Sequence, residues 1–430
     1  MIVVSLVIGI GIFRTPATVA QQSGSEFVFF AAWIIGGIIS ICGALTFAEI
    51  GSRYPVAGGF YKIFSACYHP AFAFMLNWSL VIINSFSAVG VAMVGAEYIV
   101  PVILPPHMQS VFYTKMVALT VILFLFILNY IGIKTGAKTQ NLLSGIKIVM
   151  ILGFSSIVFF NVDGATSATM PSQSFGTQNN SLLAALGVSL ISVFFTYGGY
   201  QNTINFGADV KNPQKNIPAS ILTGMLIVIA LYLLINMAYV QVLGFQKVQQ
   251  SKLLASELAS VIFGQKGFVI TSFAIFISVT GYINTALLYN PRIYFAMAQD
   301  GLLPAAFKKV NDKTQVQEFA LCFFTGIMLI ALFWLGTFEK IVNYVMFLDS
   351  FALATAAATI FIFRQRMKGL DYTGFKIKLY PVLPVVFVTM LFTVTINVFV
   401  ADVKAALGGL CIFAGGFPIY YLLMKINRVR

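Results

Sequence analysis

The sequence predicts an all-α integral membrane protein with twelve transmembrane helices, on the basis of composition, a series of apolar runs and the placement of basic residues. Of the 430 residues, 59% are hydrophobic and only 9% are charged, and the mean hydropathy is +0.92. These values exclude a soluble globular chain with a charged surface, so the solvent of this protein must be lipid. A hydrocarbon core of about 30 Å takes about 20 apolar residues per helix, and this chain is long enough for about a dozen.

Apolar runs with short polar connections follow one another along the whole chain. The first run has no basic leader and no small-residue cleavage site, so we interpret it as a retained span and not as a signal peptide. No room remains for a large soluble domain. The twelve runs cover about residues 1–19, 28–50, 71–99, 112–131, 140–160, 181–206, 218–243, 267–298, 319–335, 341–363, 381–400 and 406–424.

Basic residues predict the orientation in the membrane. The chain has 26 Lys and Arg against 13 Asp and Glu, and most of the basic residues fall in the segments that are inside if both termini are cytoplasmic. The connection at residues 161–180 has no Lys or Arg, as expected for an outer loop that joins two halves. The positive-inside rule therefore favours an even number of spans with both termini in the cytoplasm. The expected location is the plasma membrane of the cell.

Several other classes of protein are excluded or disfavoured by what the sequence lacks. The two histidines, His69 and His107, lie in predicted loops on opposite sides, so no Ser-His-Asp set can assemble in the membrane and an enzyme is not expected. There is no phosphate-binding G-x-x-x-x-G-K-[ST] motif. We expect no metal, no cofactor and no nucleic-acid partner. The cysteines show neither metal-ligand spacing nor a disulfide framework, and they are Cys42, Cys67, Cys322 and Cys411.

Two glycine-containing segments occupy corresponding positions in the two proposed halves. Residues 9–13 read GIGIF and are soon followed by Pro16, and residues 195–202 read FTYGGYQN in mid-membrane. Glycine pairs in membrane helices commonly serve close helix packing or a kink. The matched positions of the two segments favour a second interpretation, in which the first and sixth helices are broken.

A broken helix in the membrane needs a polar partner for its exposed backbone. Each free N–H or C=O group costs several kcal/mol in lipid, so breaks persist only beside a cavity. A zwitterionic amino acid suits such a place, because half-helix N-termini attract its carboxylate and half-helix C-termini attract its ammonium. A channel is the rival class, but channels usually repeat such elements around an axis, and two unlike breaks in one chain favour alternating access.

Four motifs along the chain carry a resemblance to a known family. They are residues 9–13, Phe47-Ala48-Glu49-Ile50 with Pro55, Gly58, Gly59 and Tyr61, residues 195–200 with Lys211-Asn212-Pro213 and Asn216-Ile217-Pro218, and residues 292–304, which read RIYFAMAQDGLLP. With these motifs in order, nearly the whole chain resembles the amino acid-polyamine-organocation transporters, and within them the L-type and related bacterial amino acid transporters.

The resemblance implies the leucine-transporter-type fold, with two inverted five-helix repeats, two additional helices, and helices one and six broken. No sequence repeat is visible, so the internal symmetry is expected to be structural. The whole chain, residues 1–430, is expected to form one amino acid permease domain. Its parts are a first repeat at 1–162, a second repeat at 181–365 and the additional helices at 380–426.

The resemblance also implies a binding site at the two breaks. It places the substrate carboxylate at the backbone of Ile10 and Gly11 and the ammonium at main-chain carbonyls of the other break and of Val7. Ile10 replaces the usual serine, and Tyr200 with Gln201 replaces a Trp-Asn pair found in several L-type members; backbone contacts survive both changes. The expected substrate-binding residues are Val7, Gly9, Ile10, Gly11, Phe195, Thr196, Gly198, Tyr200 and Gln201.

Charged residues outside the breaks have expected roles of their own. Phe195 is the expected aromatic gate and Asp209 an inner-gate contact. Lys147 lies in the fifth span, where it either snorkels or pairs structurally, or, as the resemblance implies, occupies the place of sodium in sodium-coupled relatives. Asp349, inside the tenth span, has either a structural or a proton-relay role. Glu49 is one of four acidic residues at helix ends, where a solvated or gating ion pair is expected.

The predicted function is sodium-independent secondary transport of neutral L-amino acids by alternating access, through exchange or proton coupling. Cationic amino acids or polyamines are the alternative cargo, and the absence of an acidic residue beside either break argues against them. Some members of the family join a glycoprotein through a cysteine between helices three and four. The stretch at residues 100–113 has no cysteine, so no disulfide-linked ancillary subunit is expected.

Overall fold

The computed structural model describes residue 7 and residues 9–56, 59–156, 182–334, 338–368 and 372–428. These ranges contain α-helices and short 3₁₀ segments and no strand, in agreement with the predicted all-α class. The α-helices are α2 (Gly11–Ser23), α3 (Glu26–Arg53), α4 (Gly59–Cys67), α5 (Pro70–Ile103), α6 (Val111–Ile131), α7 (Ile133–Ser156), α8 (Leu182–Tyr197), α9 (Pro213–Leu243), α10 (Phe245–Gln250), α11 (Leu254–Gln299), α12 (Glu318–Trp334), α13 (Phe338–Arg366), α14 (Val382–Ala401) and α15 (Val403–Arg428).

Each of the twelve apolar runs coincides with helical structure in the described residues. Eight helices are long and apolar enough to cross a membrane, namely α3, α5, α6, α9, α11, α13, α14 and α15. The runs that fall short are shorter helices or are interrupted: α2 begins only at Gly11, α8 ends at Tyr197, and α7 and α12 have short apolar parts. The integral membrane class is therefore confirmed, and the layout of twelve spans stays a prediction.

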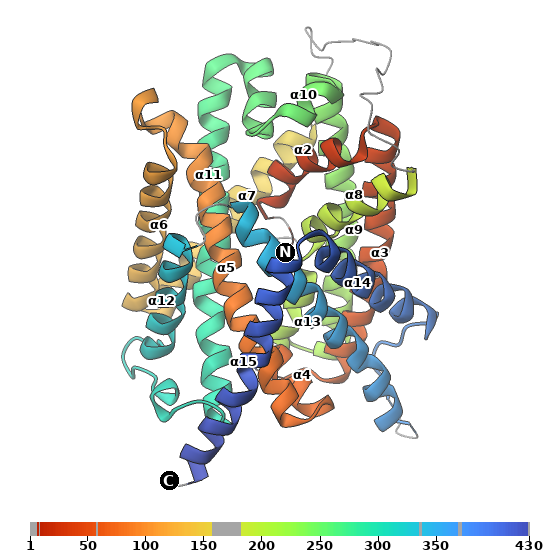
Figure 1. Ribbon diagram of the computed structural model, residues 1–430, viewed down its shortest axis with the longest axis vertical. Helices are drawn as coiled ribbons and strands as arrows, with labels where there is room; N and C mark the ends of the chain where they lie inside the picture. The colour runs from red at the N-terminus through yellow and green to blue at the C-terminus, as the bar shows by residue number, and fades with distance from the viewer. Residues whose placement is uncertain are drawn as a thin grey trace.

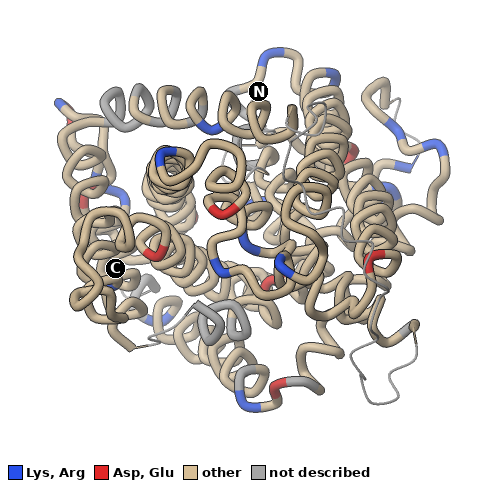
Figure 2. The backbone as a smooth tube through the Cα atoms, turned by 90° about the horizontal axis from the view of Figure 1, so that it is seen from above, with Lys and Arg blue, Asp and Glu red and all other residues tan. Residues whose placement is uncertain are grey.

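Side chains on the outside of the bundle agree with a lipid environment. Large apolar side chains such as Phe27, Val149 and Trp334 are more than two-thirds exposed. Figure 2 shows how sparsely Lys, Arg, Asp and Glu are distributed along the chain trace. A water-soluble protein would not expose so many separate apolar side chains around its whole circumference, so these surfaces face the hydrocarbon core.

Three helical features were not predicted from the sequence. The short helices α4 and α10 lie in connections, and α11 begins at Leu254, well before the apolar run that starts near residue 267. Helix α11 is also bent at Gly264, whose φ of 64° and ψ of −159° are not helical. Glycine adopts this positive φ without steric cost, which lets the chain turn before it enters the bundle.

The helices place the two glycine-containing segments in the interior. In Figure 1, α5 runs through the middle of the bundle, and it contacts α11, α13 and α15. Helix α2 starts near the centre and runs to the end of the bundle where α10 lies, and α4 and the end of α15 lie at the opposite end. Gln249 of α10 donates from Nε2 to the carbonyl oxygen of Ala20 over 3.0 Å, which holds α10 against α2.

Candidate functional site

The sixth apolar run is interrupted at its glycine pair. Helix α8 ends at Tyr197, Gly198 and Gly199 form a turn, and a 3₁₀ segment, η3 (Tyr200–Asp209), follows. The N–H of Gly198 donates to the carbonyl oxygen of Phe195 over 3.2 Å, and the φ of 118° at Gly199 favours a residue without a side chain. Runs of 3₁₀ helix longer than three or four residues are uncommon, so this stretch is unwound from α-helical geometry.

The first apolar run changes conformation at the GIGIF segment. Gly9 and Ile10 form a bend, and α2 starts at Gly11 with Ile10 as its N-cap residue. An isoleucine has no polar atom with which to cap, and no side-chain cap bond is formed. The first amides of α2 therefore lack the partner that a capping serine or aspartate would supply.

The two interruptions touch each other. A Cβ atom built on Gly11 would lie 2.9 Å from Cγ2 of Thr196 and 3.3 Å from its Cα. These distances are shorter than ordinary van der Waals contact, so only glycine allows α2 to begin this close to the end of α8. The glycines therefore serve both purposes considered from the sequence: they allow the helices to pack closely, and they lie where the helices are interrupted.

Both interruptions line one cavity of about 170 Å³. The other walls come from α5, α11 and α13, with Phe60 and Phe64 of α4. Of the residues predicted from the sequence, the structure brings eight to this cavity, and they are Val7, Gly9, Ile10, Gly11, Phe195, Thr196, Gly198 and Gln201.

Tyr200 is the predicted site residue that the structure places elsewhere. Its side chain is buried away from the cavity, with its ring centroid 6.3 Å from that of Phe47 on α3. Its hydroxyl lies against Gly43, where a Cβ atom would come within 2.1 Å of it. The turn at Gly198–Gly199 directs the next residue toward α3, so the expectation that Tyr200 contacts a substrate is not supported by its position.

Helix ends of opposite polarity face the cavity. The N-terminus of α2 carries a partial positive charge on its free amides, and the C-terminus of α8 carries a partial negative charge on its last carbonyls. Gly11 and Gly198 expose this backbone because they have no side chain. The cavity therefore offers complementary ends to a small molecule with both a carboxylate and an ammonium.

Some backbone groups at the breaks already have partners. The Gly199 N–H donates to Oε1 of Gln201 over 2.8 Å, and the Val7 carbonyl oxygen accepts from the Tyr232 hydroxyl over 3.1 Å. A carbonyl oxygen has two lone pairs, so the carbonyls of Val7 and Phe195 retain the capacity for a second donor. The Gly199 amide, in contrast, is satisfied by the protein itself.

The polar part of the wall was not predicted from the sequence. Asn77 and Asn84 on α5 line the cavity, as do Tyr282, Tyr289 and Asn290 on α11. Nδ2 of Asn84 donates to Oδ1 of Asn290 over 2.9 Å, which joins the two helices. A signal was present, because a spacing of seven residues puts Asn77 with Asn84, and Tyr282 with Tyr289, on one face of each helix.

Asp349 on α13 also lines the cavity. The preference for a neutral cargo over a cationic one rests in part on the premise that no acidic residue stands beside either break. That premise is wrong, because the tenth apolar run returns to the same cavity and brings a carboxyl group with it. Asp349 is far from both breaks in the sequence, so the sequence alone did not indicate that it lines the same cavity.

Comparison with known proteins decides the family. The family model described as amino acid permease matches residues 1–424. The chain belongs to the amino acid permeases. Among similar proteins, the serine/threonine exchanger SteT of Bacillus subtilis (strain 168) is 29% identical over 436 residues, covering 99% of this chain and 95% of the relative. The Asc-type amino acid transporter 1 of Mus musculus is 24% identical, covering 98% and 79%, and the large neutral amino acids transporter small subunit 2 of Homo sapiens is 24% identical, covering 98% and 78%.

These matches confirm the predicted amino acid-polyamine-organocation superfamily. The permease is a multi-pass membrane protein of amino acid transport, and its family and relatives are transporters and not enzymes. The matches cover almost the full chain, so the cavity between α2 and α8 lies in the part of the chain that is similar to amino acid transporters.

Two further charged residues were predicted to act near the permease site. Lys147 lies on α7 with only 2% of its surface exposed, and it does not line the cavity. Its burial gives no support to the snorkelling interpretation, because a snorkelling ammonium reaches water. The side chain of Asp209 lies outside the described part of the chain, so its gating role stays a prediction.

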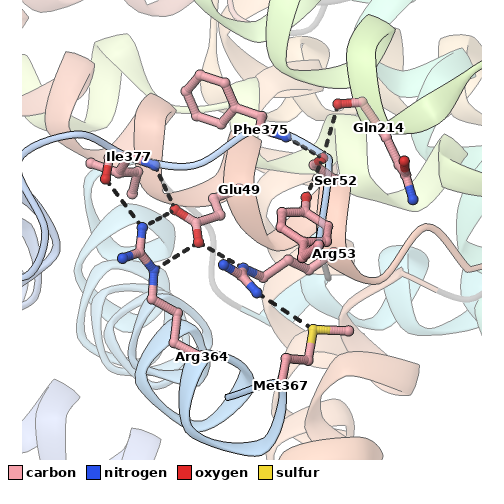
Figure 3. Close-up of polar contacts among 9 residues, drawn as sticks. Glu49, Ser52, Arg53, Gln214, Arg364, Met367, Phe375 and Ile377 are labelled. Atoms are coloured by element: carbon pink, nitrogen blue, oxygen red, sulfur yellow. Dashed lines mark hydrogen bonds and ion pairs between the residues drawn. The ribbon is translucent and has the colours of Figure 1, made fainter. Parts of the chain in front are cut away.

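A network of ion pairs lies at the end of the permease that contains α4. Figure 3 shows Glu49 of α3 surrounded by Arg53, Arg364 and the main chain of Ile377. The guanidinium of Arg364 also lies 3.8 Å from the ring centroid of Tyr380. A solvated or a gating ion pair was expected at this helix end; Glu49 is completely buried, so the solvated alternative is wrong and the gating one stays a prediction.

A more exposed pair at the same end of the permease joins α4 to α11. Nζ of Lys62 lies 2.8 and 2.6 Å from the two carboxylate oxygens of Asp300, and the Tyr61 hydroxyl also donates to Asp300. Burial of this carboxyl favours its neutral form, but the bonds from Lys62 and Tyr61 outweigh it and hold the pKa of Asp300 below its usual range. Arg14 and Glu97 form a further pair between α2 and α5.

Proposed function

We propose that this permease is a sodium-independent secondary transporter of neutral L-amino acids that works by alternating access, through exchange or proton coupling. The observation that carries the proposal is that the start of α2 and the end of α8 meet at one cavity. Opposite helix polarities at one enclosed place suit a zwitterion better than any singly charged solute.

The binding mode follows from the backbone groups at the cavity. The substrate carboxylate accepts hydrogen bonds from the uncapped amides at Ile10 and Gly11, and its ammonium donates to the carbonyls of Val7, Phe195 and Gly198. Phe195 lines the cavity at the end of α8, a position suited to an aromatic gate over the bound molecule. With main-chain recognition of this kind, the protein needs no charged side chain to bind the carboxylate and the ammonium on the α-carbon of the substrate.

Neutral cargo is supported by the relatives and by the composition of the wall. The named relatives include a serine/threonine exchanger and a transporter of large neutral amino acids. The cavity combines apolar residues such as Leu80, Val81 and Leu353 with a few amides and hydroxyls and one carboxyl group, as small-molecule sites usually do.

Sodium independence rests on Lys147. The resemblance implies that sodium-coupled members of the superfamily hold the ion at this place on α7, where the buried amino group of Lys147 supplies either a permanent positive charge or a group that exchanges a proton. Cations are costly inside a membrane protein, and a bound sodium beside this lysine would add electrostatic repulsion to that cost.

The membrane arrangement is part of the proposal. We place twelve spans in a leucine-transporter-type fold, with repeats at 1–162 and 181–365 and additional helices at 380–426, both termini in the cytoplasm and the protein in the cell membrane. The end of the bundle that holds Arg53, Lys62 and Arg364 is then the inner end, in agreement with the positive-inside rule. The human relative is named a small subunit, but residues 100–113 here have no cysteine, so we propose that no disulfide-linked subunit is required.

The test is uptake of a panel of labelled amino acids by the purified protein in liposomes. Liposomes are empty or preloaded with unlabelled amino acid, and each is assayed with sodium or choline outside and with or without a pH gradient. We expect saturable uptake of neutral L-amino acids that is unchanged when choline replaces sodium. Stimulation by preloading identifies exchange, and stimulation by the pH gradient identifies proton coupling.

Two results contradict the proposal. A strict requirement for external sodium rejects the role given to Lys147. Flux that neither saturates nor discriminates between L- and D-amino acids rejects a transporter with a stereospecific backbone site and supports a channel.

A further inference from the structure

Asp349 is a carboxyl group inside a membrane helix that faces the substrate cavity. It lies in the apolar stretch of α13 between Leu348 and Ser350, and the cavity reaches it together with Met346 and Ser350. Within the described ranges, no hydrogen bond or ion pair joins it to another residue. A carboxyl group at such a depth is costly unless something donates to it.

The amides that line the cavity hydrogen-bond to other groups and not to Asp349. Nδ2 of Asn77 donates to the Ala73 carbonyl over 2.7 Å, and Nδ2 of Asn290 donates to the Ala286 carbonyl over 2.9 Å. Nδ2 of Asn84 donates to Oδ1 of Asn290. None of these three amides donates to Asp349, and neither do the hydroxyls of Tyr282 and Tyr289 in the same wall, so the carboxylate oxygens stay open to a donor inside the cavity.

We propose that Asp349 is a specificity-determining residue that accepts a hydrogen bond from a donor on the substrate's side chain, either a hydroxyl or an ammonium. This inference rests on the proposed amino acid transport and deepens it: a hydroxyl donor keeps the cargo neutral, as proposed, and an ammonium donor makes it cationic, the alternative cargo. The helix ends of α2 and α8 bind the carboxylate and ammonium that all amino acids share. Asp349 contacts the side chain, which differs from one amino acid to the next.

The chemistry of a carboxylate explains the selectivity. An ionised carboxylate only accepts hydrogen bonds, so it rewards a donor and gains nothing from a methyl group of the same size. An apolar side chain displaces the water that solvates Asp349 in the open cavity and leaves the acid without a donor. Sites that hydrogen-bond a substrate group reject analogues that lack it strongly, since the buried polar atom then stays unpaired.

The experiment compares amino acids that have nearly the same size and differ in one donor. Serine and 2-aminobutyrate differ in a hydroxyl against a methyl group, and ornithine and norleucine differ in a terminal ammonium against a methyl group. Uptake of each labelled compound into liposomes is measured for the wild type, for Asp349→Leu, which removes the acceptor, and for Asp349→Asn, which removes the charge but keeps an acceptor oxygen. Asp402→Asn, at the corner between α14 and α15 and away from the cavity, is the matched control.

The expected wild type and control take up the donor-bearing member of at least one pair with a kcat/KM about 10- to 100-fold higher than its partner. Asp349→Leu reduces this ratio to about one while it retains uptake of the apolar member. Asp349→Asn distinguishes the two donors: it preserves the serine preference if the hydroxyl is the recognised group, and it abolishes the ornithine preference if the ammonium is.

Four results overturn the inference. If the ratio of kcat/KM between the two members of each pair is unchanged in both Asp349 variants, the carboxyl group does not recognise the substrate side chain. Equal loss of both members of each pair in Asp349→Asn, with a protein that elutes as the wild type does, indicates a structural or proton-coupling role. Absence of uptake of every amino acid by the wild type rejects the proposed function together with this inference, whereas intact uptake without side-chain discrimination rejects the inference alone.

Discussion

Arg364 binds Glu49 in a two-point contact between α13 and α3. Its Nη2 donates to Oε2 of Glu49 over 2.6 Å and its Nε donates to Oε1 over 2.8 Å. Nε of Arg53 and the N–H of Ile377 donate to the same carboxylate over 2.6 and 2.8 Å. One fully buried carboxylate therefore holds two helices and the connection after α13 together, at the end of the bundle opposite to α10 (Figures 1 and 3).

Glu49→Gln should destabilise the permease strongly. The amide keeps the shape of the side chain, but it leaves the buried Arg53 and the partly buried Arg364 without their counter-charge and turns an acceptor oxygen into a donor NH₂ group. Breaking one partner of a buried ion pair costs about 3–5 kcal/mol. Thermal unfolding of the detergent-solubilised protein, followed by loss of the monodisperse peak, measures the change.

The matched control is Glu26→Gln, in the first turn of the same helix α3, where the side chain is exposed. It loses only a favourable interaction with the helix dipole, about 0.3–1 kcal/mol. Equal unfolding temperatures for the two variants would show that the Glu49 network does not stabilise the fold.

Gly11→Ala should abolish or severely reduce transport. The new methyl group would stand 2.9 Å from Thr196 Cγ2 and 3.3 Å from Thr196 Cα, so α2 and α8 have to separate at the cavity. A displacement of about 1 Å in a binding site can cost about 100-fold in rate. The measurement is initial uptake in liposomes at equal protein incorporation.

Gly187→Ala on α8 is the control for this change, because a Cβ atom there has nothing within 4 Å. It should transport as the wild type does. Full activity of Gly11→Ala would mean that the two interruptions tolerate separation, and the proposed backbone site would lose its geometric basis.

The Lys62–Asp300 pair should give the permease a pH-dependent contribution to stability. The pKa of Asp300 is lowered in the folded protein, so the pair stabilises the fold above the unfolded-state pKa of about 3.9 and loses this effect as the pH falls through the lower folded value. The side chains are about one-third exposed, so the contribution is about 1 kcal/mol or less.

The measurement is the difference in unfolding temperature between the wild type and Asp300→Asn at pH 6 and at about pH 3. We expect a difference at pH 6 that shrinks at the lower pH. Asp312→Asn, an exposed change in the loop before α12, should match the wild type at both values. A gap between the wild type and Asp300→Asn that grows on acidification would contradict the sign derived for this pair.

The sequence was informative where structure depends on neighbours along the chain. Helical runs follow from local hydropathy, and the break at Gly198 follows from the glycine pair, because conformational freedom is a property of the residue itself. The cavity walls on α5, α11 and α13 could not be assigned in this way. Which helix faces which is decided by packing between distant segments, so Asp349 was noticed as a buried acid and not as part of the site.

Two other residues show the same limit. Tyr200 follows the break directly, but its ring fills space beside Phe47 and Gly43, which only the packing of α3 against η3 provides. Glu49 was expected at a helix end beside water, and the connection after α13 covers it through Ile377. In both cases a distant segment determines the environment of a residue whose local sequence was correctly interpreted.

Gln201 should matter more for the stability of the break than for substrate contact. Its Oε1 accepts from the Gly199 N–H over 2.8 Å and so satisfies an amide that the unwound stretch would otherwise leave free. Gln201→Met has nearly the same size and no acceptor of comparable strength, and the partly buried Gly199 N–H would lose its partner at a cost of about 1 kcal/mol, the lower end of the range for an unsatisfied donor. Gln241→Met makes the same chemical change at an exposed position on α9, where the cost should stay below about 0.5 kcal/mol. Thermal unfolding compares the two variants with the wild type. If they lose the same small amount, the Gly199 amide is satisfied by another group, and the break does not depend on Gln201.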